Sequence, residues 1–424
     1  MPNNWKTYKL SDIGEIIGGG TPSTSKQEYY NGDIPWITPR DLSNHSSMFI
    51  SKGERSITEL GLKNSSAKLM PEGTVLLTSR APIGYLAISE NQVCTNQGFK
   101  SIIVNQNLVN NKFIYYLLKS NIDLLLQNAS GSTFQEISGS VVKNLEFHFP
   151  PLKEQKSIAS ILSAIDEKIE NNLAINKTLE EMAMALYKHW FVDFGPFQDG
   201  EFVESELGRI PKGWEVKRLD EIADFINGYA FKSGELKNDN NGNSYHIFKM
   251  GHIERGGGLK ENATKSYIDK SKCEKLEKYI LKVGDLLMAM TDMKDNVAIL
   301  GNTALINEND KYIVNQRVGL IRPNNDIGID YSFLYLITNE NSFIERLRSQ
   351  ANSGVQVNLS TDAIKSAKMV IGSKEINLNF DDIVKPLYDN IFQNKIENQT
   401  LTQLRDTLLP KLISGEVRLK EFRE

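Results

Sequence analysis

Apolar side chains recur most regularly between Lys153 and Trp190, a stretch that contains neither glycine nor proline. Ten positions spaced alternately by four and three residues line one side of this stretch, and eight of the ten are apolar. They are Ile158, Leu162, Ile165, Ile169, Asn172, Asn176, Leu179, Ala183, Leu186 and Trp190. Such spacing is typical of a coiled-coil seam. At a rise of about 1.5 Å per residue, it predicts one helix about 57 Å long.

A second apolar stripe predicts another long helix over residues 381–413. Its members are Ile383, Leu387, Ile391, Ile396, Leu401, Leu404 and Leu408. Pro386 and Pro410 lie near the two ends, so the middle of this helix is its best supported part. Because one amphipathic helix of this length is not stable alone in water, we predict that the two helices pack antiparallel as a coiled coil. Their stripes would form the interface between the helices or with a partner protein.

Two polar residues, Asn172 and Asn176, occupy positions of the first seam where apolar side chains are expected. One interpretation is that the seam simply tolerates them. The other is that they fix the register between the two helices, as buried polar side chains do in coiled coils.

Outside the long helices the pattern changes to short apolar or alternating runs separated by turn residues, which predicts strands mixed with short helices. Strands are predicted at 74–78, 100–104 and 318–321, helices at 111–121 and 331–350, and loops at 18–20, 240–242 and 256–258. The predicted fold class is therefore α+β.

The second half of the chain repeats the first in order, which predicts two similar α/β domains. Residues 2–13, 71–77, 95–98, 113–117, 130–131 and 168–171 match residues 211–222, 282–288, 314–317, 333–337, 353–354 and 395–398. The offset grows slowly from 209 to 227, as loop insertions would make it. We expect domains at 1–150 and 205–380, a long helix and connector at 151–204, and a second long helix and tail at 381–424. Together they form a pseudo-twofold internal repeat.

Composition limits the function classes. No apolar run approaches the roughly 18 to 20 residues that cross a bilayer, and the N-terminus lacks the layout of a signal peptide. The only cysteines, Cys94 and Cys273, predict neither a disulfide framework nor a cysteine-based metal site, so a cytoplasmic protein is expected. The net charge is −4, and residues 151–200 are the most acidic part, with eight acidic and five basic side chains.

Motifs for catalysis are weak. The sequence Phe149-Pro150-Pro151-Leu152 is similar to an amino-methyltransferase motif but lacks the Asn or Asp that holds the target amine. The glycine run at 18–20 is neither a Walker loop nor a dinucleotide fingerprint, and the five histidines show no metal-ligand spacing. The sequence therefore predicts no catalytic residue, no metal and no cofactor in this chain.

Four segments resemble the specificity subunit of Type I restriction-modification enzymes. Residues 150–169 are similar to the entry into that family's central conserved helix, and residues 185–194 to its exit. Residues 404–416 are similar to the end of its distal conserved helix, and residues 211–219 to the opening of a target-recognition domain. One difference concerns length: Lys168 to Lys188 spans 20 positions but Lys395 to Lys411 spans 16, which predicts a distal helix about one turn shorter.

The resemblance implies a DNA-reading subunit without catalysis of its own. Each target-recognition domain would bind one half of a split, asymmetric site in double-stranded DNA, and the helix pair would set the spacer. Two methyltransferase subunits that carry S-adenosylmethionine would methylate adenine at N6, and a motor-nuclease subunit can join them. The stripe residues Ile158, Leu162, Ile165, Ile169, Asn172, Leu179, Leu186, Ile391, Ile396, Leu401, Leu404 and Leu408 would form the helix or partner-subunit interface. No membrane and no small-molecule substrate are expected.

The repeat helps to choose candidate DNA-binding residues, because domains that read different half-sites should share scaffold residues and differ in base-reading ones. The differing polar positions are Arg40, Thr78, Ser79, Arg80, Ser132, Thr133 and Gln135 in the first domain, and His252, Thr291, Lys294, Gln356 and Asn358 in the second; Ser130, although it matches Ser353, is also a candidate. The shared pair Asn96-Gln97 and Asn315-Gln316 is expected to be architectural or to position phosphates.

A different class of function stays open. The neutral-to-acidic charge also suits a protein-interaction scaffold whose helix pair joins partners without reading DNA. The duplicated domains favour the DNA reader, because a site in two parts needs a reader in two parts.

Overall fold

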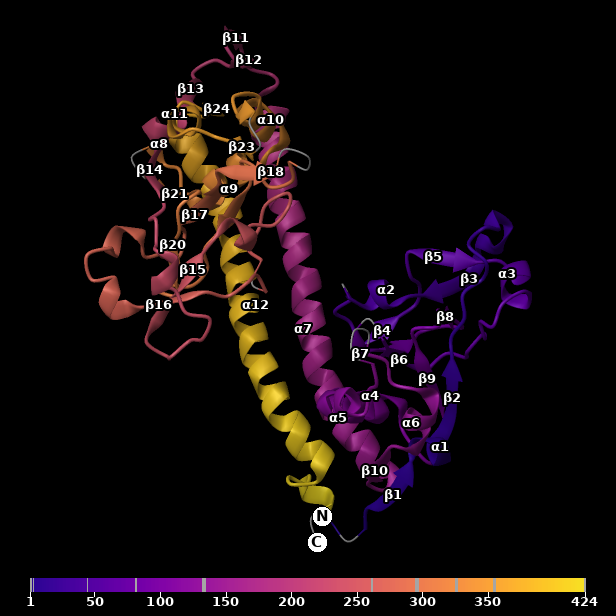
Figure 1. The fold of residues 1–424 in the computed structure, drawn as a ribbon. Helices are drawn as coiled ribbons and strands as arrows, with labels where there is room; N and C mark the ends of the chain where they lie inside the picture. Colours follow the sequence, from indigo (N-terminus) through magenta and orange to yellow (C-terminus); the bar gives the residue numbers. More distant parts are fainter. Residues whose placement is uncertain are drawn as a thin grey trace. The chain divides into compact units, whose positions relative to one another are not determined.

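The computed structural model describes residues 2, 4–43, 45–80, 82–131, 135–260, 262–293, 297–324, 327–353 and 356–422. It divides into two compact units. Unit 1 comprises Met1–Ala174 and Lys395–Glu424, and unit 2 comprises Ile175–Asn394. Each unit contains one mixed domain of strands and short helices together with parts of the two long helices (Figure 1).

Unit 1 has a five-stranded sheet, a three-stranded sheet and a strand pair among its described residues. The larger sheet has the order β2 (Gly14–Gly18), β9 (Lys100–Val104), β6 (Val75–Ser79), β7 (Ile83–Ser89) and β4 (Phe49–Ile50). The smaller has the order β5 (Arg55–Ile57), β3 (Tyr30–Ile37) and β8 (Cys94–Thr95), and β1 (Lys6–Lys9) pairs with β10 (Glu146–Phe149). The short helices are α1 (Leu10–Ile13), α2 (Pro39–Ser43), α3 (Glu59–Lys63), α4 (Asn111–Ser120), α5 (Ile122–Gln127) and α6 (Gly139–Asn144).

Unit 2 has a similar set of elements. Its four-stranded sheet has the order β14 (Ala223–Asn227), β21 (Val318–Pro323), β17 (Leu286–Ala289) and β19 (Thr303–Leu305). Two three-stranded sheets follow: β16 (Tyr267–Asp269), β15 (Ser244–Phe248) and β20 (Tyr312–Val314); and β18 (Thr291–Met293), β23 (Gln356–Asn358) and β22 (Asn352–Ser353). The pairs are β11 (Phe202–Ser205) with β12 (Gly208–Pro211), and β13 (Glu215–Arg218) with β24 (Lys368–Ile371). The short helices are α8 (Leu219–Ile222), α9 (Tyr331–Asn339), α10 (Asn341–Ser349) and α11 (Thr361–Lys365).

The predicted internal repeat is confirmed by strand topology. In unit 1, β3 pairs antiparallel with β5 and parallel with β8. In unit 2, β15 pairs antiparallel with β16 and parallel with β20. The larger sheets of the two units also have the same strand order. The order β2, β9, β6, β7 in unit 1 corresponds to β14, β21, β17, β19 in unit 2. Two copies of one α+β fold therefore make up the chain.

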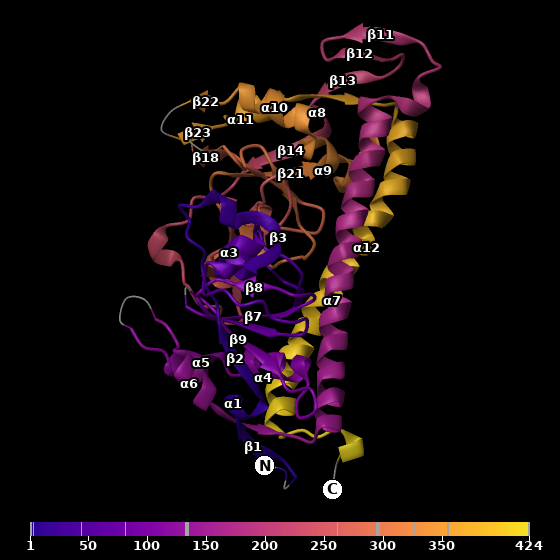
Figure 2. The same cartoon turned by 90° about the vertical axis from the view of Figure 1, so that its right-hand side faces the viewer.

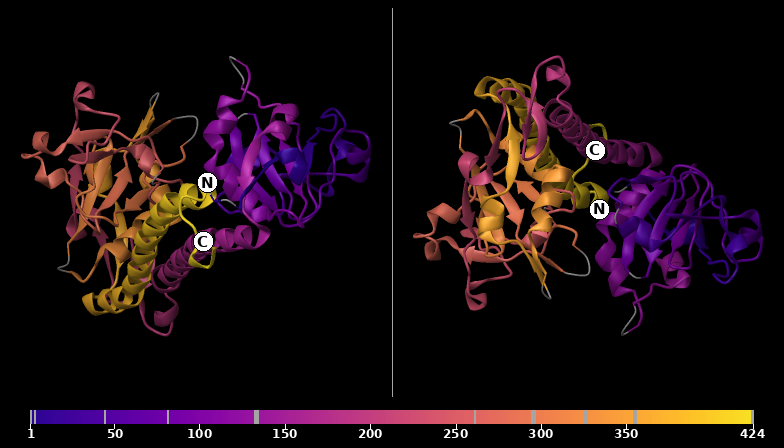
Figure 3. Two further views of the ribbon diagram at one scale, coloured as in Figure 1. Left: turned by 90° about the horizontal axis from the view of Figure 1, so that it is seen from below. Right: turned by 90° about the horizontal axis from the view of Figure 1, so that it is seen from above.

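Both predicted long helices are present, and two views 90° apart show them side by side (Figures 1 and 2). Helix α7 (Leu152–Tyr187) has 36 residues and continues into a π-helical turn at Lys188–Val192. Helix α12 (Lys374–Ser414) has 41 residues. In unit 2, α12 lies beside the orange elements of that unit (Figure 3, left). None of the helices in the described part of the chain is long and apolar enough to span a membrane.

Helix α12 begins seven residues before the predicted start at 381, so the expectation of a shorter distal helix is wrong. Its first turns are held by the core of unit 2, where Asn377 and Phe380 are fully buried. The amide Nδ2 of Asn377 donates to the carbonyl oxygens of Ile327 and Gly372. Because this buried position is polar, apolar periodicity does not extend to the start of the helix. The break at Glu340 likewise divides the predicted helix 331–350 into α9 and α10.

The predicted seam of α7 is confirmed, because each of its ten positions is buried or half-buried, including Leu179 and Leu186. The predicted stripe of α12 is wrong in part. Ile396 is 54% exposed and Leu404 is 45% exposed, and Ile383 is exposed as well. Ile391 of the predicted stripe is buried, and Leu387, Leu401 and Leu408 are half-buried. The other buried apolar residues of this helix, which the stripe did not include, are Phe380, Val384, Tyr388, Phe392, Leu409, Leu412 and Ile413. Apolar periodicity does not identify the contact face of α12 where that face is polar.

That polar contact centres on Asn172, which is fully buried in unit 1. Its amide donates to Oε2 of Glu397 at 2.7 Å and to Oδ1 of Asn398 at 2.8 Å, and its oxygen accepts from Nζ of Lys168 at 3.0 Å. The hydrogen bonds from Asn172 and Lys168 lower the pKa of Glu397. In unit 2, Oδ1 of Asn176 accepts from Nδ2 of Asn394 at 2.8 Å. These bonds favour the interpretation that the two asparagines fix the helix register.

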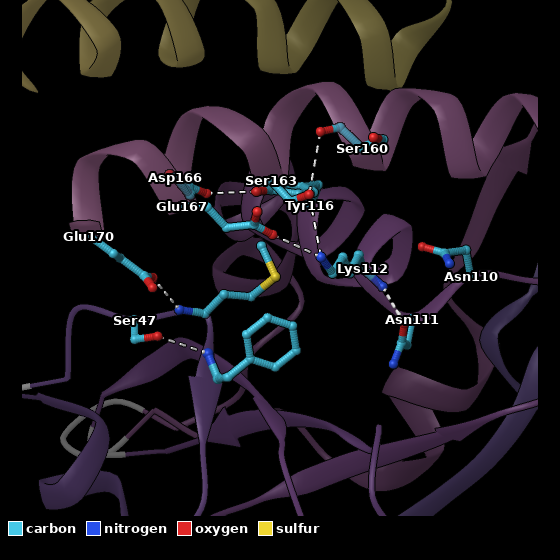
Figure 4. A network of polar contacts seen from close by, with 12 residues as sticks. Ser47, Asn110, Asn111, Lys112, Tyr116, Ser160, Ser163, Asp166, Glu167 and Glu170 are labelled. Carbon is cyan, nitrogen blue, oxygen red and sulfur yellow. Dashed lines mark hydrogen bonds and ion pairs between the residues drawn. The ribbon is translucent and has the colours of Figure 1, made fainter. Parts of the chain in front are cut away.

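The domain of unit 1 is attached to the same helix pair through carboxylates of α7 (Figure 4). Asp166 accepts from the hydroxyl of Tyr116 on α4 and from Nη1 of Arg405 on α12, each at 2.7 Å. One carboxylate thereby joins both long helices to the domain. The adjacent residue Glu167 makes an ion pair with Lys112, and one turn further on Glu170 accepts from the backbone nitrogen of Met48.

Replacing Asn172 with alanine is expected to destabilise unit 1 by about 1–3 kcal/mol, because the buried seam loses the hydrogen bonds that the amide of Asn172 donates to Glu397 and Asn398. Urea denaturation of the isolated chain measures the loss. The matched control is Leu173→Ala, next in sequence but 47% exposed, which should change stability by about 0.5 kcal/mol or less. Equal effects of the two substitutions would contradict a register role for Asn172.

Candidate nucleic-acid interface

Three separate segments of unit 1 meet at one end of its sheets. Strands β3 and β8 run parallel and end together, and the backbone nitrogen of Asn96 donates to Ile37 at 3.0 Å. The carbonyl of Gly98 accepts from the nitrogen of Ser79 at 2.7 Å, just before Arg80. The carbonyl of Ser79 in turn accepts from Ile137 at 3.0 Å. We call the side chains gathered here loop cluster 1: Arg80, Asn96, Gln97, Ser130, Gln135 and Glu136.

Unit 2 repeats this construction bond for bond. The nitrogen of Asn315 donates to Phe248 at 3.0 Å, where the parallel strands β15 and β20 end. The carbonyl of Arg317 accepts from Met290 at 3.1 Å, and the carbonyl of Met290 accepts from Leu359 at 2.9 Å. We call the side chains gathered here loop cluster 2: Thr291, Asn315, Gln316, Arg317, Gln356 and Asn358. The differing segments that the sequence paired across the repeat thus lie together in each unit.

Most of the predicted DNA-binding residues in these clusters are accessible. Gln97, Ser130 and Gln135 are exposed, as are Gln316 and Asn358, whereas Arg80, Asn96, Asn315 and Gln356 are half-buried. Arg40 on α2 is also exposed, and its Nη1 lies 3.9 Å from Oε2 of Glu54. Ser132, Thr133 and Lys294 lie outside the described residues. The accessible side chains are guanidinium, amide and hydroxyl groups, which are the groups that read base edges.

Thr78 and Ser79 are corrections, because both are fully buried. Strand β6 extends to Ser79, one residue beyond the predicted strand 74–78, so both residues belong to a central strand and not to a turn after it. The hydroxyl of Thr78 donates to the carbonyl of Pro82 and accepts from the nitrogen of Tyr85, both at 2.8 Å. Thr291 of unit 2 is buried as well, and its hydroxyl donates to Oδ1 of Asn358 at 2.8 Å. These hydroxyl groups hold the loops in place and do not face solvent.

His252 is a further correction, since it is 1% exposed and belongs to the core of unit 2. Its Nε2 lies 3.2 Å from Nε2 of His246, and its Nδ1 accepts from the backbone nitrogen of Lys249 at 3.1 Å. Burial lowers the pKa of both histidines, to about 4 for His246, which nearby His252 and lysine side chains also lower. His252 occupies the position that corresponds to Asp41 in unit 1, and it packs there as a neutral imidazole against His246.

The backbone of the shared Asn-Gln pair is closely packed in both units. A Cβ atom on Gly19 would lie 1.9 Å from the carbonyl oxygen of Asn96, and one on Gly228 would lie 2.0 Å from that of Asn315. Both units thus need glycine where a neighbouring strand passes this turn. Only the side chains of the pair differ in use: Oδ1 of Asn96 accepts from the nitrogen of Gly98 at 2.8 Å.

Positive charge in the two clusters comes from one arginine each. In unit 1, Nη1 of Arg80 lies 3.5 Å from Oε2 of Glu136, whose other oxygen lies 3.6 Å from Nζ of Lys100. In unit 2, Nη1 of Arg317 donates to Oε1 of Gln356 at 3.3 Å. The candidate residues derived from the sequence did not include Arg317. The sequence nevertheless contained a sign of it, because Arg317 and Gly98 differ directly after an Asn-Gln pair that both domains share.

Two copies of one fold, each with a polar loop cluster of different composition, define a binding protein with two related recognition surfaces. No group of three metal-ligating side chains occurs in the part of the chain that the structure describes. The chain belongs to the family of Type I restriction-modification DNA specificity subunits, because residues 2–181 and 211–405 match the Type I restriction modification DNA specificity domain. That family is a DNA-recognition subunit and not an enzyme.

Relatives of known identity agree over the whole chain. The chain is 37% identical to the Type I restriction enzyme MjaIX specificity subunit of Methanocaldococcus jannaschii over 432 residues, which covers 100% of this chain and 95% of the relative. It is 26% identical to the HindI specificity subunit of Haemophilus influenzae, covering 98% and 100%. The crystal structure of a Type I S subunit from M. genitalium shares the fold, with a TM-score of 0.61, 19% identity and 97% of each chain covered.

The buried histidine pair predicts that acid weakens unit 2. A histidine with a folded pKa near 4 and an unfolded pKa near 6.5 holds fewer protons in the folded state between these values, so its stability contribution is present above pH 6.5 and lost toward pH 4. The loss is about 1.4 kcal/mol per pH unit. Urea unfolding of wild type and His246→Gln from pH 7 to pH 4 measures it: the wild type should lose more stability than the variant. Parallel curves would contradict the assignment.

Proposed function

We propose that the chain is the DNA-reading subunit of a Type I restriction-modification complex, and that each loop cluster reads one half of a bipartite, asymmetric site. One observation carries this proposal: the two clusters share their backbone hydrogen bonds but differ in the side chains that they expose. A shared backbone holds each cluster in the same way against its own domain. Different side chains make the two halves of the recognised site different.

The exposed groups have the chemistry for direct readout. Arginine bonds to the O6 and N7 acceptors of guanine, and asparagine or glutamine bonds to N6 and N7 of adenine. Among the positions that differ between the units, loop cluster 1 offers Arg80 and Gln135, and loop cluster 2 offers Arg317 and Asn358. Backbone nitrogens and lysines near the clusters would contact phosphates, which position the subunit without reading sequence.

The chemistry of modification is proposed for partner subunits. Two methyltransferase subunits that hold S-adenosylmethionine would methylate adenine at N6, a motor-nuclease subunit would restrict, and the long helices would set the spacer between the half-sites. The complex would work in the cytoplasm, where its DNA lies.

Exposed apolar side chains on the long helices are the proposed contact for these partners. They are Ile161, Leu173, Ile396 and Leu404 in unit 1, and Ile175, Met182, Leu378 and Ile383 in unit 2. Apolar residues exposed in rows on a helix mark interaction sites more often than scattered ones do. On this proposal Ile396 and Leu404, which do not pack in the helix seam, keep their predicted role toward a partner.

A protein-interaction scaffold without DNA reading is the second candidate. The net charge of −4 and the exposed apolar residues on the long helices favour it. It does not account for loop clusters whose backbone is repeated and whose exposed side chains differ. A scaffold has no need for two versions of one polar surface.

The proposed function is tested by mapping methylated adenines in a host that carries the partner subunits, with and without this gene. One split motif should disappear with the gene. An identical set of methylated sites in both strains, with no second specificity gene expressed, would refute the proposal.

Arg80→Ala is expected to weaken binding of the reconstituted complex to its cognate site by about 1–3 kcal/mol, because one bidentate contact to a base is lost. A gel-shift titration with a duplex that carries the methylated motif measures the change. Lys63→Ala, which removes an exposed charge at the end of α3, is the matched control and should leave affinity unchanged. Unchanged affinity and unchanged sequence preference in Arg80→Ala would remove Arg80 from the interface.

A further inference from the structure

We propose that each unit reads a guanine through a single arginine, and that the two units deliver this arginine from different loops: Arg80 from the end of β6 in unit 1, and Arg317 from the turn after β20 in unit 2. The inference rests on the proposed function and deepens it, because it names the base that each loop cluster recognises. It also assigns a specificity role to Arg317.

Backbone hydrogen bonds establish which positions are equivalent. Ser79 donates to Gly98 in unit 1 as Met290 donates to Arg317 in unit 2, so Gly98 and Arg317 occupy the same position. Arg80 and Thr291 are the residues that follow, and they too correspond. Each unit therefore has one arginine and one small residue at this pair of positions, but in the opposite order.

In unit 1 a side chain on residue 98 would have to share its space with the side chain of Arg80. A Cβ atom on Gly98 would lie 3.7 Å from Cγ of Arg80, 3.0 Å from Oδ1 of Asn96 and 3.0 Å from Cγ of Pro39. The side chain of Arg80 therefore extends over the position where a side chain on residue 98 would begin. In unit 2 the short side chain of Thr291 is buried and bonded to Asn358, which leaves this space to Arg317.

The backbone of Arg317 is unusual for a residue other than glycine. Its φ angle is +68°, in the left-handed region that residues other than glycine seldom adopt. Glycine occupies the equivalent position in unit 1, so glycine is compatible with the fold there. A strained backbone that carries an exposed, charged side chain is a recurrent feature of functional sites.

Both guanidinium groups are held in place without being neutralised. Arg317 has the uncharged Gln356 as its partner, at 3.3 Å. Arg80 has Glu136, but Lys100 contacts the same carboxylate, so these three side chains together keep a charge of +1. Each arginine retains further N–H donors for the O6 and N7 atoms of a guanine.

The test uses Arg317→Gly in the complete complex, because glycine suits the left-handed backbone and matches Gly98. Methylated adenines are mapped in a host that expresses the variant with the partner subunits. The expected result is that one G·C position of a single half-site becomes degenerate, with a roughly 5- to 150-fold loss of preference for that base pair. Arg80→Ala should relax a position in the other half-site. Arg209→Ala, on the hairpin β11–β12, is the control and should leave the motif unchanged.

Two results would overturn the inference: an unchanged motif in Arg317→Gly, or weaker methylation with every base preference retained, which is the behaviour of a phosphate contact. If the variant does not methylate at all, its complex is titrated against four duplexes that differ only at the candidate base pair. Equal affinities support the inference, and a retained preference for guanine overturns it. Failure of the proposed function is a separate outcome, since the wild-type gene would then leave no methylated motif of its own.

Discussion

The buried contact between α7 and α12 at Asn172 is the constraint on which the rest of unit 1 depends. Apolar seams attract two helices but allow several registers, because one leucine can replace another. The amide of Asn172 has partners only where Glu397 and Asn398 lie opposite it. A shift of the helices would leave this amide unpaired in a buried seam, at a cost of about 1–3 kcal/mol. Because Asp166 on the same helix binds both Tyr116 and Arg405, the register of the helix pair also fixes where the domain of unit 1 is attached.

Within each domain, the groups that hold the loops together differ from the exposed side chains to which the proposed function gives recognition. Backbone groups make the hydrogen bonds that join the three loop segments, and they are the same in both units. Buried hydroxyl groups such as Thr78 and Thr291 hold the segments from inside. Exposed side chains contribute little to this framework, so they can differ between units without loss of the fold. On the proposed function, this separation explains how one duplicated fold would present two surfaces of different specificity.

The sequence predicted the fold where periodicity was apolar and failed where polar residues were buried. The seam of α7 was found because its apolar residues outnumber Asn172 and Asn176. The face of α12 was predicted only in part, because Asn377, Asn394 and Asn398 also make its contacts and apolar periodicity favoured the exposed Ile396. Recognition residues were harder still. The burial of Thr78 and Ser79 depends on where strand β6 ends, and the burial of His252 depends on how it packs in the core of unit 2 against His246, six residues earlier; residue spacing alone shows neither. The segments that meet in the loop clusters were nevertheless identified, because the repeat allows two sequences with the same fold to be compared position by position.

A chain with a net charge of −4 would be a weak DNA binder if affinity came from this chain alone, since non-specific affinity is electrostatic. The loop clusters are local exceptions, because each has one arginine that its neighbours leave charged. A single guanidinium supplies discrimination at one base pair and little total affinity. On the proposed function, phosphate contacts would come largely from partner subunits, while this chain would determine which sequence they meet. An acidic surface then has an advantage: the free subunit would not be retained on unrelated DNA before its complex forms.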